Sequence, residues 1–170
     1  MTSDLTFKAI QPDELIPAEW SHLSQGAVNL FNMALIKTST GYLAAYRVVG
    51  EADGLRRIAV CKMSKDLEVM PGSAIGASDL IDFAPVVTEQ GKVWFADPRF
   101  FSLEGKIFMV WNNGHTEDDT NHQFMVELDE VTGKPKAKAK EIVLRSGRRK
   151  TEKNWAFFET ENQVWARSEE

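Results

Sequence analysis

The chain has 170 residues, 43% of them hydrophobic, and a formal net charge of −5. This length and composition indicate one soluble domain of ordinary size that can bury a core. They exclude a membrane-spanning protein, because no apolar run approaches the ~20 residues that a spanning helix needs, and the N-terminus lacks the basic and apolar segments of a secretory signal.

The cysteine count and the net charge indicate the cellular compartment and the class of partner. Cys61 is the single cysteine of the chain, which excludes an intrachain disulfide and a Cys-x-x-Cys metal or redox site. We therefore expect a reducing, cytoplasmic location. The acidic balance argues against nucleic acid as the main partner, and the sequence lacks the phosphate-binding glycine motifs of nucleotide-binding folds.

The chain reads mostly as short β-strands separated by turn residues. Residues 1–25 hold the only segment that resembles a helix or an irregular lead-in. The expected strands are Phe31–Lys37, Tyr42–Val49, Arg56–Met63, Val93–Phe101, Lys106–Asn112, Gln123–Leu128, Glu141–Leu144, Trp155–Glu159 and Gln163–Arg167. Short strands at regular intervals predict an all-β sandwich, barrel or propeller.

An internal repeat favours the propeller. FNMALIKTSTGYLAAYRVV (31–49) and FADPRFFSLEGKIFMVWNN (95–113) both read as strand, turn and aromatic-rich strand, with Gly41 aligned on Gly105. KNWAFFETENQVWARSE (153–169) continues the pattern, with Asp97 aligned on Asn154. A repeat of roughly sixty residues is typical of propeller blades.

This interpretation divides the chain into a lead-in over residues 1–25 and a partial β-propeller domain over residues 26–170. Polar residues recur at the start of the first strand of each repeat, the strand that lines the channel of a propeller, so we expect Asp97 and Arg99 to face a channel. Propellers have about 4–8 blades, whereas this sequence holds about two and a half repeats. We expect an incomplete propeller, or two copies that close a ring.

Three segments of the repeats resemble a known group of proteins. FNMALIKTSTGYLAAYR, WFADPRFF and EKNWAFFE are similar to the Asn-Pro-Ser, Glu-Asp-Pro-Arg and Lys-Asn-Trp segments of five-bladed propellers that act on β-mannosides. This group includes the phosphorylases and hydrolases of glycoside hydrolase family 130 and β-mannosyltransferase-like relatives. The chain departs from the group at Ala96, where a glutamate is usual, and at Phe157, where a proline is expected.

The resemblance implies a carbohydrate ligand and a set of site residues. Asp97 takes the place of a general acid, which would protonate the leaving oxygen of a glycoside and would need a raised pKa. The implied substrate-binding residues are Asn32, Arg47, Arg99, Lys153, Asn154 and Trp155. No metal or organic cofactor is implied, and inorganic phosphate is a candidate co-substrate.

The residues alone leave structural alternatives open. Asp97 could cap a turn and pair with Arg99, which on a regular strand would point to the same side. Trp155 could be part of the core, and Arg47 could form a surface ion pair.

Two polar segments have simple interpretations. The loop NNGHTEDDTNH (112–122) contains metal-capable side chains, but their spacing matches no metal motif, and we expect a solvated hairpin loop. The basic segment 134–150 could bind a polyanion. Its lysines at 134, 136, 138 and 140 alternate, however, as on the solvent face of an exposed strand.

Three functions follow from these observations. The first is a carbohydrate-active propeller that hydrolyses, phosphorolyses or transfers β-mannosides or similar glycosides. The second is a non-catalytic glycan-binding or remnant module, so that the sequence leaves enzymatic activity open. The third is a β-rich interaction protein that uses the basic segment on an acidic partner, with salt-sensitive binding.

Overall fold

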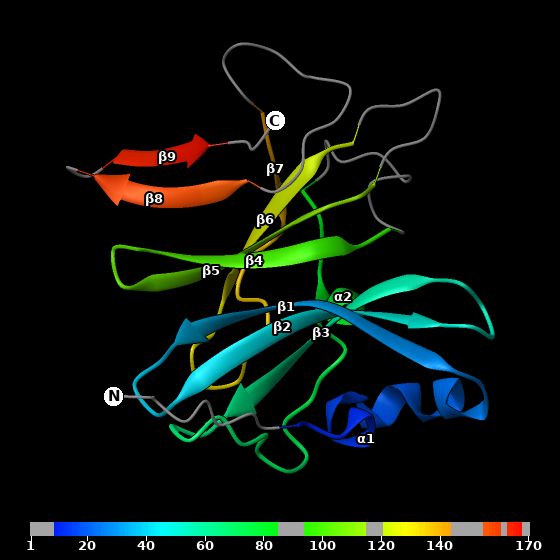
Figure 1. Cartoon of the computed structure of the whole chain (residues 1–170). Coiled ribbons are helices and arrows are strands. Elements are labelled where there is room, and N and C mark those ends of the chain that lie inside the picture. Colours follow the sequence, from blue (N-terminus) through cyan, green and yellow to red (C-terminus); the bar gives the residue numbers. More distant parts are fainter. Residues whose placement is uncertain (1–8, 85–93, 115–120, 144–154, 161–162, 168–170) are drawn as a thin grey trace, which may run out of the picture.

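The computed structural model describes residues 9–84, 94–114, 121–143, 155–160 and 163–167. In this part of the chain, strands form three antiparallel sheets, none of which closes on itself (Figure 1). The first sheet contains β1 (Val28–Lys37), β2 (Tyr42–Gly50) and β3 (Arg56–Met63). The second contains β4 (Ala96–Leu103), β5 (Lys106–Asn112), β6 (Gln123–Leu128) and β7 (Lys140–Ile142). The third contains β8 (Ala156–Thr160) and β9 (Gln163–Arg167).

The mostly β character predicted from the sequence is confirmed. Four strands, β3, β5, β6 and β9, have the predicted bounds, and the others differ by a few residues at their ends. Hairpin strands are well predicted because alternating apolar residues and turn residues are local signals. No helix in the described part of the chain is long and apolar enough to cross a membrane.

Helical structure was predicted less well. The lead-in contains the expected helical turns, α1 (Pro12–Leu15) and the 3₁₀ helix η1 (Ala18–Gln25), but α2 (Ala77–Leu80) was not predicted. Four residues are too few to show helical periodicity. Tertiary contacts hold this turn, because Trp20 Nε1 donates a hydrogen bond to Asp79 Oδ2 at 2.6 Å.

The lead-in covers one face of the first sheet. Leu15, Trp20 and Leu23 are buried against the side chains of β2 and β3 that point away from the second sheet. The hydroxyl of Tyr46 on β2 donates a hydrogen bond to the carbonyl of Leu15 at 2.6 Å, deep in this layer. The lead-in is therefore packed as part of the hydrophobic core.

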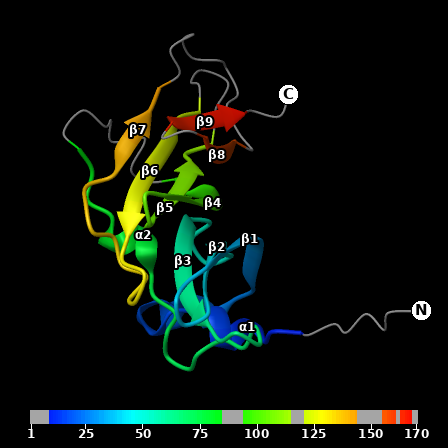
Figure 2. The same cartoon turned by 90° about the vertical axis from the view of Figure 1, so that its left-hand side faces the viewer.

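The opposite face of the first sheet packs on the second sheet. This core layer joins Leu43, Ala45, Ile58 and Val60 of the first sheet to Ile107, Met109, Trp111, Phe124 and Val126 of the second. Because β2 is buried on both faces, its sequence is almost continuously apolar rather than alternating. Figure 2 shows the three sheets following one another away from α1.

The first strands of the three sheets lie in chain order, with β1 in contact with β4 and β4 in contact with β8 (Figure 1). This order brings the N-terminal strands of the sequence repeats together. It therefore places the polar residues of β1 and β4 at one junction between the first and second sheets.

Candidate functional site

A bulge interrupts both β1 and β4 at equivalent positions. The pairing of β1 with β2 shifts between Phe31 and Ala34, and that of β4 with β5 shifts between Ala96 and Arg99. Asn32 and Asp97 lie in these bulges, 65 residues apart, with φ angles of 52° and 51°. Asn and Asp are among the non-glycine residues that tolerate this left-handed conformation best, and bulges redirect side chains.

These bulges correct the alignment of the repeats. The strand pairing makes Asn32 equivalent to Asp97 and Arg47 equivalent to Asn112. This register differs by one residue from the alignment of Gly41 on Gly105 that the sequence suggested. The two glycines are not equivalent: Gly105 lies in the turn between β4 and β5, whereas Gly41 corresponds in the strand pairing to Lys106, the first residue of β5.

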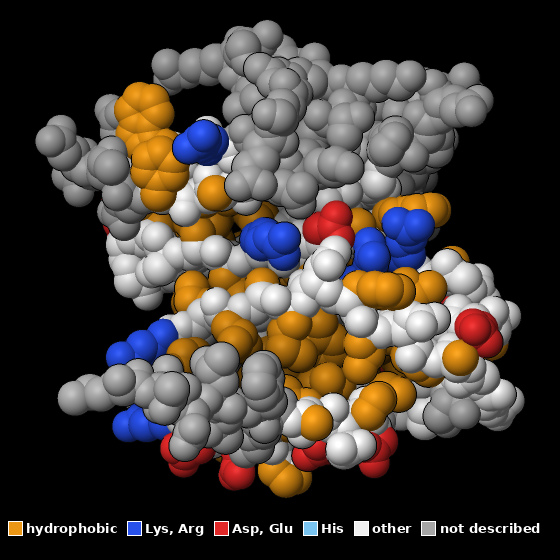
Figure 3. Space-filling view, in the orientation of Figure 1, with side chains coloured by type: hydrophobic (Ala, Val, Ile, Leu, Met, Phe, Trp, Pro, Cys, Tyr) orange, Lys and Arg blue, Asp and Glu red, His pale blue; other side chains and the backbone are white. Residues whose placement is uncertain are grey.

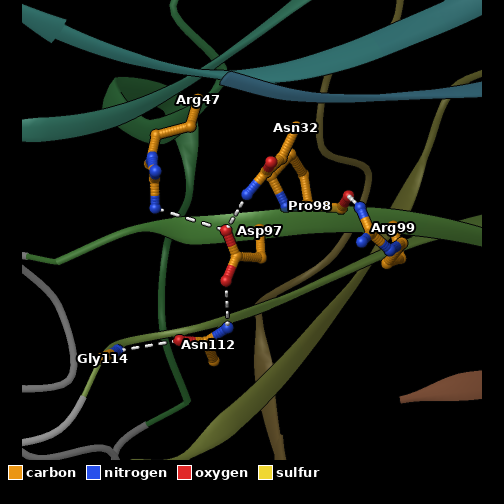
Figure 4. Close-up of polar contacts among 7 residues, drawn as sticks. All are labelled: Asn32, Arg47, Asp97, Pro98, Arg99, Asn112 and Gly114. Atoms are coloured by element: carbon orange, nitrogen blue, oxygen red, sulfur yellow. Dashed lines mark hydrogen bonds and ion pairs between the residues drawn. The ribbon is translucent and has the colours of Figure 1, made fainter. Parts of the chain in front are cut away.

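The carboxylate of Asp97 is the centre of a polar cluster between the two sheets (Figure 4). Its Oδ1 atom accepts a hydrogen bond from the side-chain amide of Asn32 and lies 3.3 Å from Arg47 Nη1. Its Oδ2 atom lies 3.5 Å from the amide nitrogen of Asn112. The side chain of Asp97 is 21% exposed, so this carboxylate is held by three donors yet remains open to a ligand.

Sequence analysis missed Asn112, which is almost completely buried. Its side-chain oxygen accepts a hydrogen bond from the backbone N–H of Gly114 at 3.0 Å, which turns its amide group toward Asp97 (Figure 4). One signal could have revealed it. Asn112 is a polar residue at the end of an aromatic strand, and in the repeats it corresponds to Arg47 on β2.

Arg99 does not pair with Asp97 in the described structure, so the alternative in which these two residues form an ion pair was wrong. The bulge breaks the regular alternation of the strand between them. Arg99 Nη1 instead donates a hydrogen bond to the carbonyl of Pro98 at 3.2 Å (Figure 4). The ion pair of Asp97 with Arg47 joins the first sheet to the second, a partnership that the sequence did not reveal.

Among the described residues, the guanidinium groups of Arg47 and Arg56 and the single carboxylate of Asp97 interact at this cluster. Arg47 and Arg56 project from neighbouring strands on the same face of the first sheet. The guanidinium of Arg56 lies 3.9 Å from the ring centre of Trp94, and that of Arg47 lies 4.7 Å from the ring centre of Phe31. Figure 3 shows acidic, basic and hydrophobic side chains together at the boundary between the two sheets.

The charge of Arg47 acts on the guanidinium group of Arg56. Burial, and then the charge of Arg47, lower the pKa of Arg56, while the charge of Asp97 opposes this shift. The Nε atom of Arg47 is buried and has no hydrogen-bond acceptor among the described residues. An anion or a sugar hydroxyl at this position would supply one.

The third segment of the predicted site is not part of this cluster in the described structure. Lys153 and Asn154 lie outside the described residues. Trp155 is only 4% exposed and packs on Phe157, with ring centres 6.0 Å apart. This burial fits the core alternative for Trp155 better than a stacking surface for a sugar.

Much of the histidine loop and of the basic segment lies outside the described residues. His115 and residues 117–119 lie outside the described residues, as do residues 144–150. His122 Nδ1 lies 2.6 Å from Glu141 Oε1, and the described residues contain no group of metal-capable side chains that could hold an ion.

The lysines of the basic segment do not form one exposed strand, as the alternation suggested. Of the four, only Lys140 lies in a strand, β7, and the other three lie in the preceding turn and connection. Pro135 interrupts this segment and cannot donate a backbone hydrogen bond to a ladder.

Comparison with known proteins gives no assignment. The chain matches no protein-family model, and a search of curated proteins found no match.

Proposed function

We propose that this chain is a carbohydrate-active protein of propeller type that binds a β-mannoside or similar glycoside at the Asp97 cluster. The observation that carries the proposal is the partly exposed carboxylate of Asp97, held by Asn32, Arg47 and Asn112. Carboxylates, amides and guanidinium groups are the side chains that bind sugar hydroxyls through paired hydrogen bonds.

The backbone supports a functional role for the same residues. Asn32 and Asp97 both have positive φ angles, and strained backbone is concentrated at binding and catalytic sites. The three antiparallel sheets, whose first strands lie side by side, are consistent with successive propeller blades. In this proposal the cluster borders the channel of the propeller.

As an enzyme, the chain would use Asp97 as the general acid that protonates the leaving oxygen of the glycoside. The group that attacks the sugar would be water, inorganic phosphate or a hydroxyl of another sugar. The positive charges of Arg47 and Arg56, and the free Nε atom of Arg47, support phosphate as a co-substrate. A reducing, cytoplasmic compartment remains part of this proposal.

A second candidate function is glycan binding without turnover. The ion pair between Arg47 and Asp97 favours it, because this pair is made by an ionised carboxylate, whereas a general acid must carry a proton. An ionised Asp97 would accept hydrogen bonds from sugar hydroxyls. The two functions share one site and differ in the chemistry that Asp97 performs.

The test combines turnover and binding on the same protein. The purified chain is incubated with a β-1,4-linked mannobiose and with an aryl β-mannoside, with and without phosphate, and products are measured by chromatography. Binding of mannobiose is measured by NMR titration. Asp97→Asn is the test variant, and Asp53→Asn, at a surface ion pair with Arg57, is its control.

Each result has a distinct meaning. Turnover that Asp97→Asn abolishes and Asp53→Asn leaves intact supports the enzyme. Binding without product, weakened by Arg47→Met, supports the glycan-binding function. The absence of both binding and product with several β-glycosides would refute the proposal.

A further inference from the structure

Two consecutive arginines of β3 have different surroundings. Arg56 and Arg57 point to opposite faces of the first sheet. Arg57 lies on the side of the lead-in, where its Nη2 atom forms an ion pair with Asp53 Oδ2 at 2.6 Å and its guanidinium lies 5.7 Å from the ring centre of Trp20. Arg56 lies on the side of the Asp97 cluster, where its guanidinium stacks on Trp94, 3.9 Å from the ring centre.

The guanidinium of Arg56 is oriented by a ring but is not paired with an anion. Among the described residues, no group accepts a hydrogen bond from it, and the nearby carboxylate of Asp97 forms its ion pair with Arg47 instead. A planar guanidinium offers paired N–H donors that match the oxygens of a carboxylate or a phosphate. Because stacking already restricts this group, it loses less conformational entropy when it binds an anion.

Arg47 places a second guanidinium on the same face of the sheet. It pairs with Ile58, two residues along β3 from Arg56. The burial of Arg56 and the charge of Arg47 lower the pKa of Arg56, and the charge of Asp97 opposes this shift. Two guanidinium groups beside one carboxylate leave one positive charge among these three groups. A ligand with a negative charge would therefore act on Arg56 in the same direction as Asp97.

Exposed aromatic rings border the two guanidinium groups. Trp94, which lies under Arg56, is 38% exposed, and Phe31, which lies under Arg47, is 41% exposed. Inorganic phosphate could use the guanidinium groups but not this apolar surface. A sugar ring can place its C–H groups against an aromatic ring and its hydroxyls on polar side chains. The combination of rings, guanidinium groups and the Asp97 cluster fits a sugar that carries a negative charge.

We propose that the glycoside bound at the Asp97 cluster is acidic, and that Arg56 and Arg47 bind a carboxylate or phosphate group carried by its sugar while Trp94 contacts the ring. This inference rests on the proposed function and adds the class of sugar. It makes Arg56 and Trp94 residues that determine specificity, because they favour an acidic sugar over a neutral one. It assigns them no part in breaking the glycosidic bond.

The test compares two ligands that differ only in their charged groups. They are β-1,4-linked mannobiose and β-1,4-linked dimannuronate, in which carboxylates replace the hydroxymethyl groups, and NMR titration of the full chain measures both affinities. We expect the dimannuronate to bind about tenfold more tightly or better, as for hydrogen bonds to charged groups.

Three variants connect this preference to the proposed residues. Arg56→Gln should abolish the preference by weakening only the dimannuronate, whereas Trp94→Leu should weaken both ligands. Arg57→Gln is the matched control, because Arg57 lies on the same strand but on the opposite face and should leave both affinities unchanged. The amide spectrum of each variant shows whether it is folded.

Further ligands identify the source of the negative charge. Mannose 6-phosphate, compared with mannose, tests a phosphate group on the sugar, and inorganic phosphate tests the free ion. Acidic and neutral sugars that bind equally well, a preference that Arg56→Gln leaves unchanged, or inorganic phosphate that binds as tightly as the acidic sugars would overturn this inference. In each of these cases a bound neutral glycoside leaves the proposed function in place. The absence of binding to every sugar would refute the proposed function itself, and this inference with it.

Discussion

Asn32 and Asp97 are joined by a hydrogen bond between side chains that lie 65 residues apart and rest on equivalent, left-handed backbone positions. Each residue sits in a bulge of the first strand of its sheet. The bulges turn the two side chains toward one another across the junction of the sheets. A repeated backbone irregularity, rather than a regular strand, thus builds the candidate site.

The backbone strain at Asn32 can be measured separately from its hydrogen bond. Asn32→Gly and Asn32→Ala both remove the bond to Asp97, but only alanine keeps a Cβ atom at a φ angle of 52°. We expect the free energy of unfolding of the alanine variant to be about 1 kcal/mol lower than that of the glycine variant. Urea unfolding measures this difference, and equal stabilities would show that the position is unstrained.

Gly41 and Gly105 should respond differently to alanine. A Cβ atom at Gly41 would lie 2.1 Å from the carbonyl oxygen of Met63, whereas Gly105 has open space and a φ angle of 73°. Gly105→Ala should therefore cost only the backbone strain, about 1 kcal/mol. Gly41→Ala must displace backbone and should cost about 3 kcal/mol or more.

Chemical denaturation of both glycine variants tests this contrast. Gly54→Ala, which also has open space and a φ angle of 65°, is a matched control for Gly105→Ala. If Gly41→Ala proved no worse than these two, the close approach of the β1–β2 turn to Met63 would be wrong.

The ion pair of Asp53 with Arg57 should make part of the stability depend on pH. The hydrogen bond from Arg57, and then that from the backbone of Leu55, lower the pKa of Asp53 from 3.8 to about 2. The folded state therefore binds the proton less readily than the unfolded state. This contribution is complete above about pH 5 and is lost as the pH falls through 4 toward 2.

Urea midpoints measured between pH 5 and pH 2 should show this loss in the unchanged chain, and Asp53→Asn should reduce it. Because the pair lies at the surface, the effect will be small. The same slope in both proteins would mean that other carboxylates account for the acid sensitivity.

Cys61 should be inert in the folded protein. It is fully buried in β3, and burial raises the pKa of its thiol to about 11. At pH 8 only about one thiol in a thousand would then be ionised, and the reagent must also reach it. We expect negligible reaction with an aromatic disulfide reagent until urea unfolds the chain, and rapid labelling of the native protein would contradict the buried position.

The sequence by itself determined the hairpins. Four of the nine predicted strands have the observed bounds, and the pairing of β8 with β9 preserves the alignment of Phe101 on Phe158. Alternating apolar residues and short turns act within a few positions, so that they can be recognised without knowledge of distant contacts.

Tertiary structure decided how the candidate site is assembled. The ion pair of Asp97 with Arg47, the role of Asn112 and the burial of Trp155 all depend on which sheet packs against which. A one-residue bulge redirects a side chain without leaving a clear mark in the sequence. The direction of the Asp97 side chain therefore depends on the strand pairing and on the packing of the two sheets, neither of which can be read from the sequence.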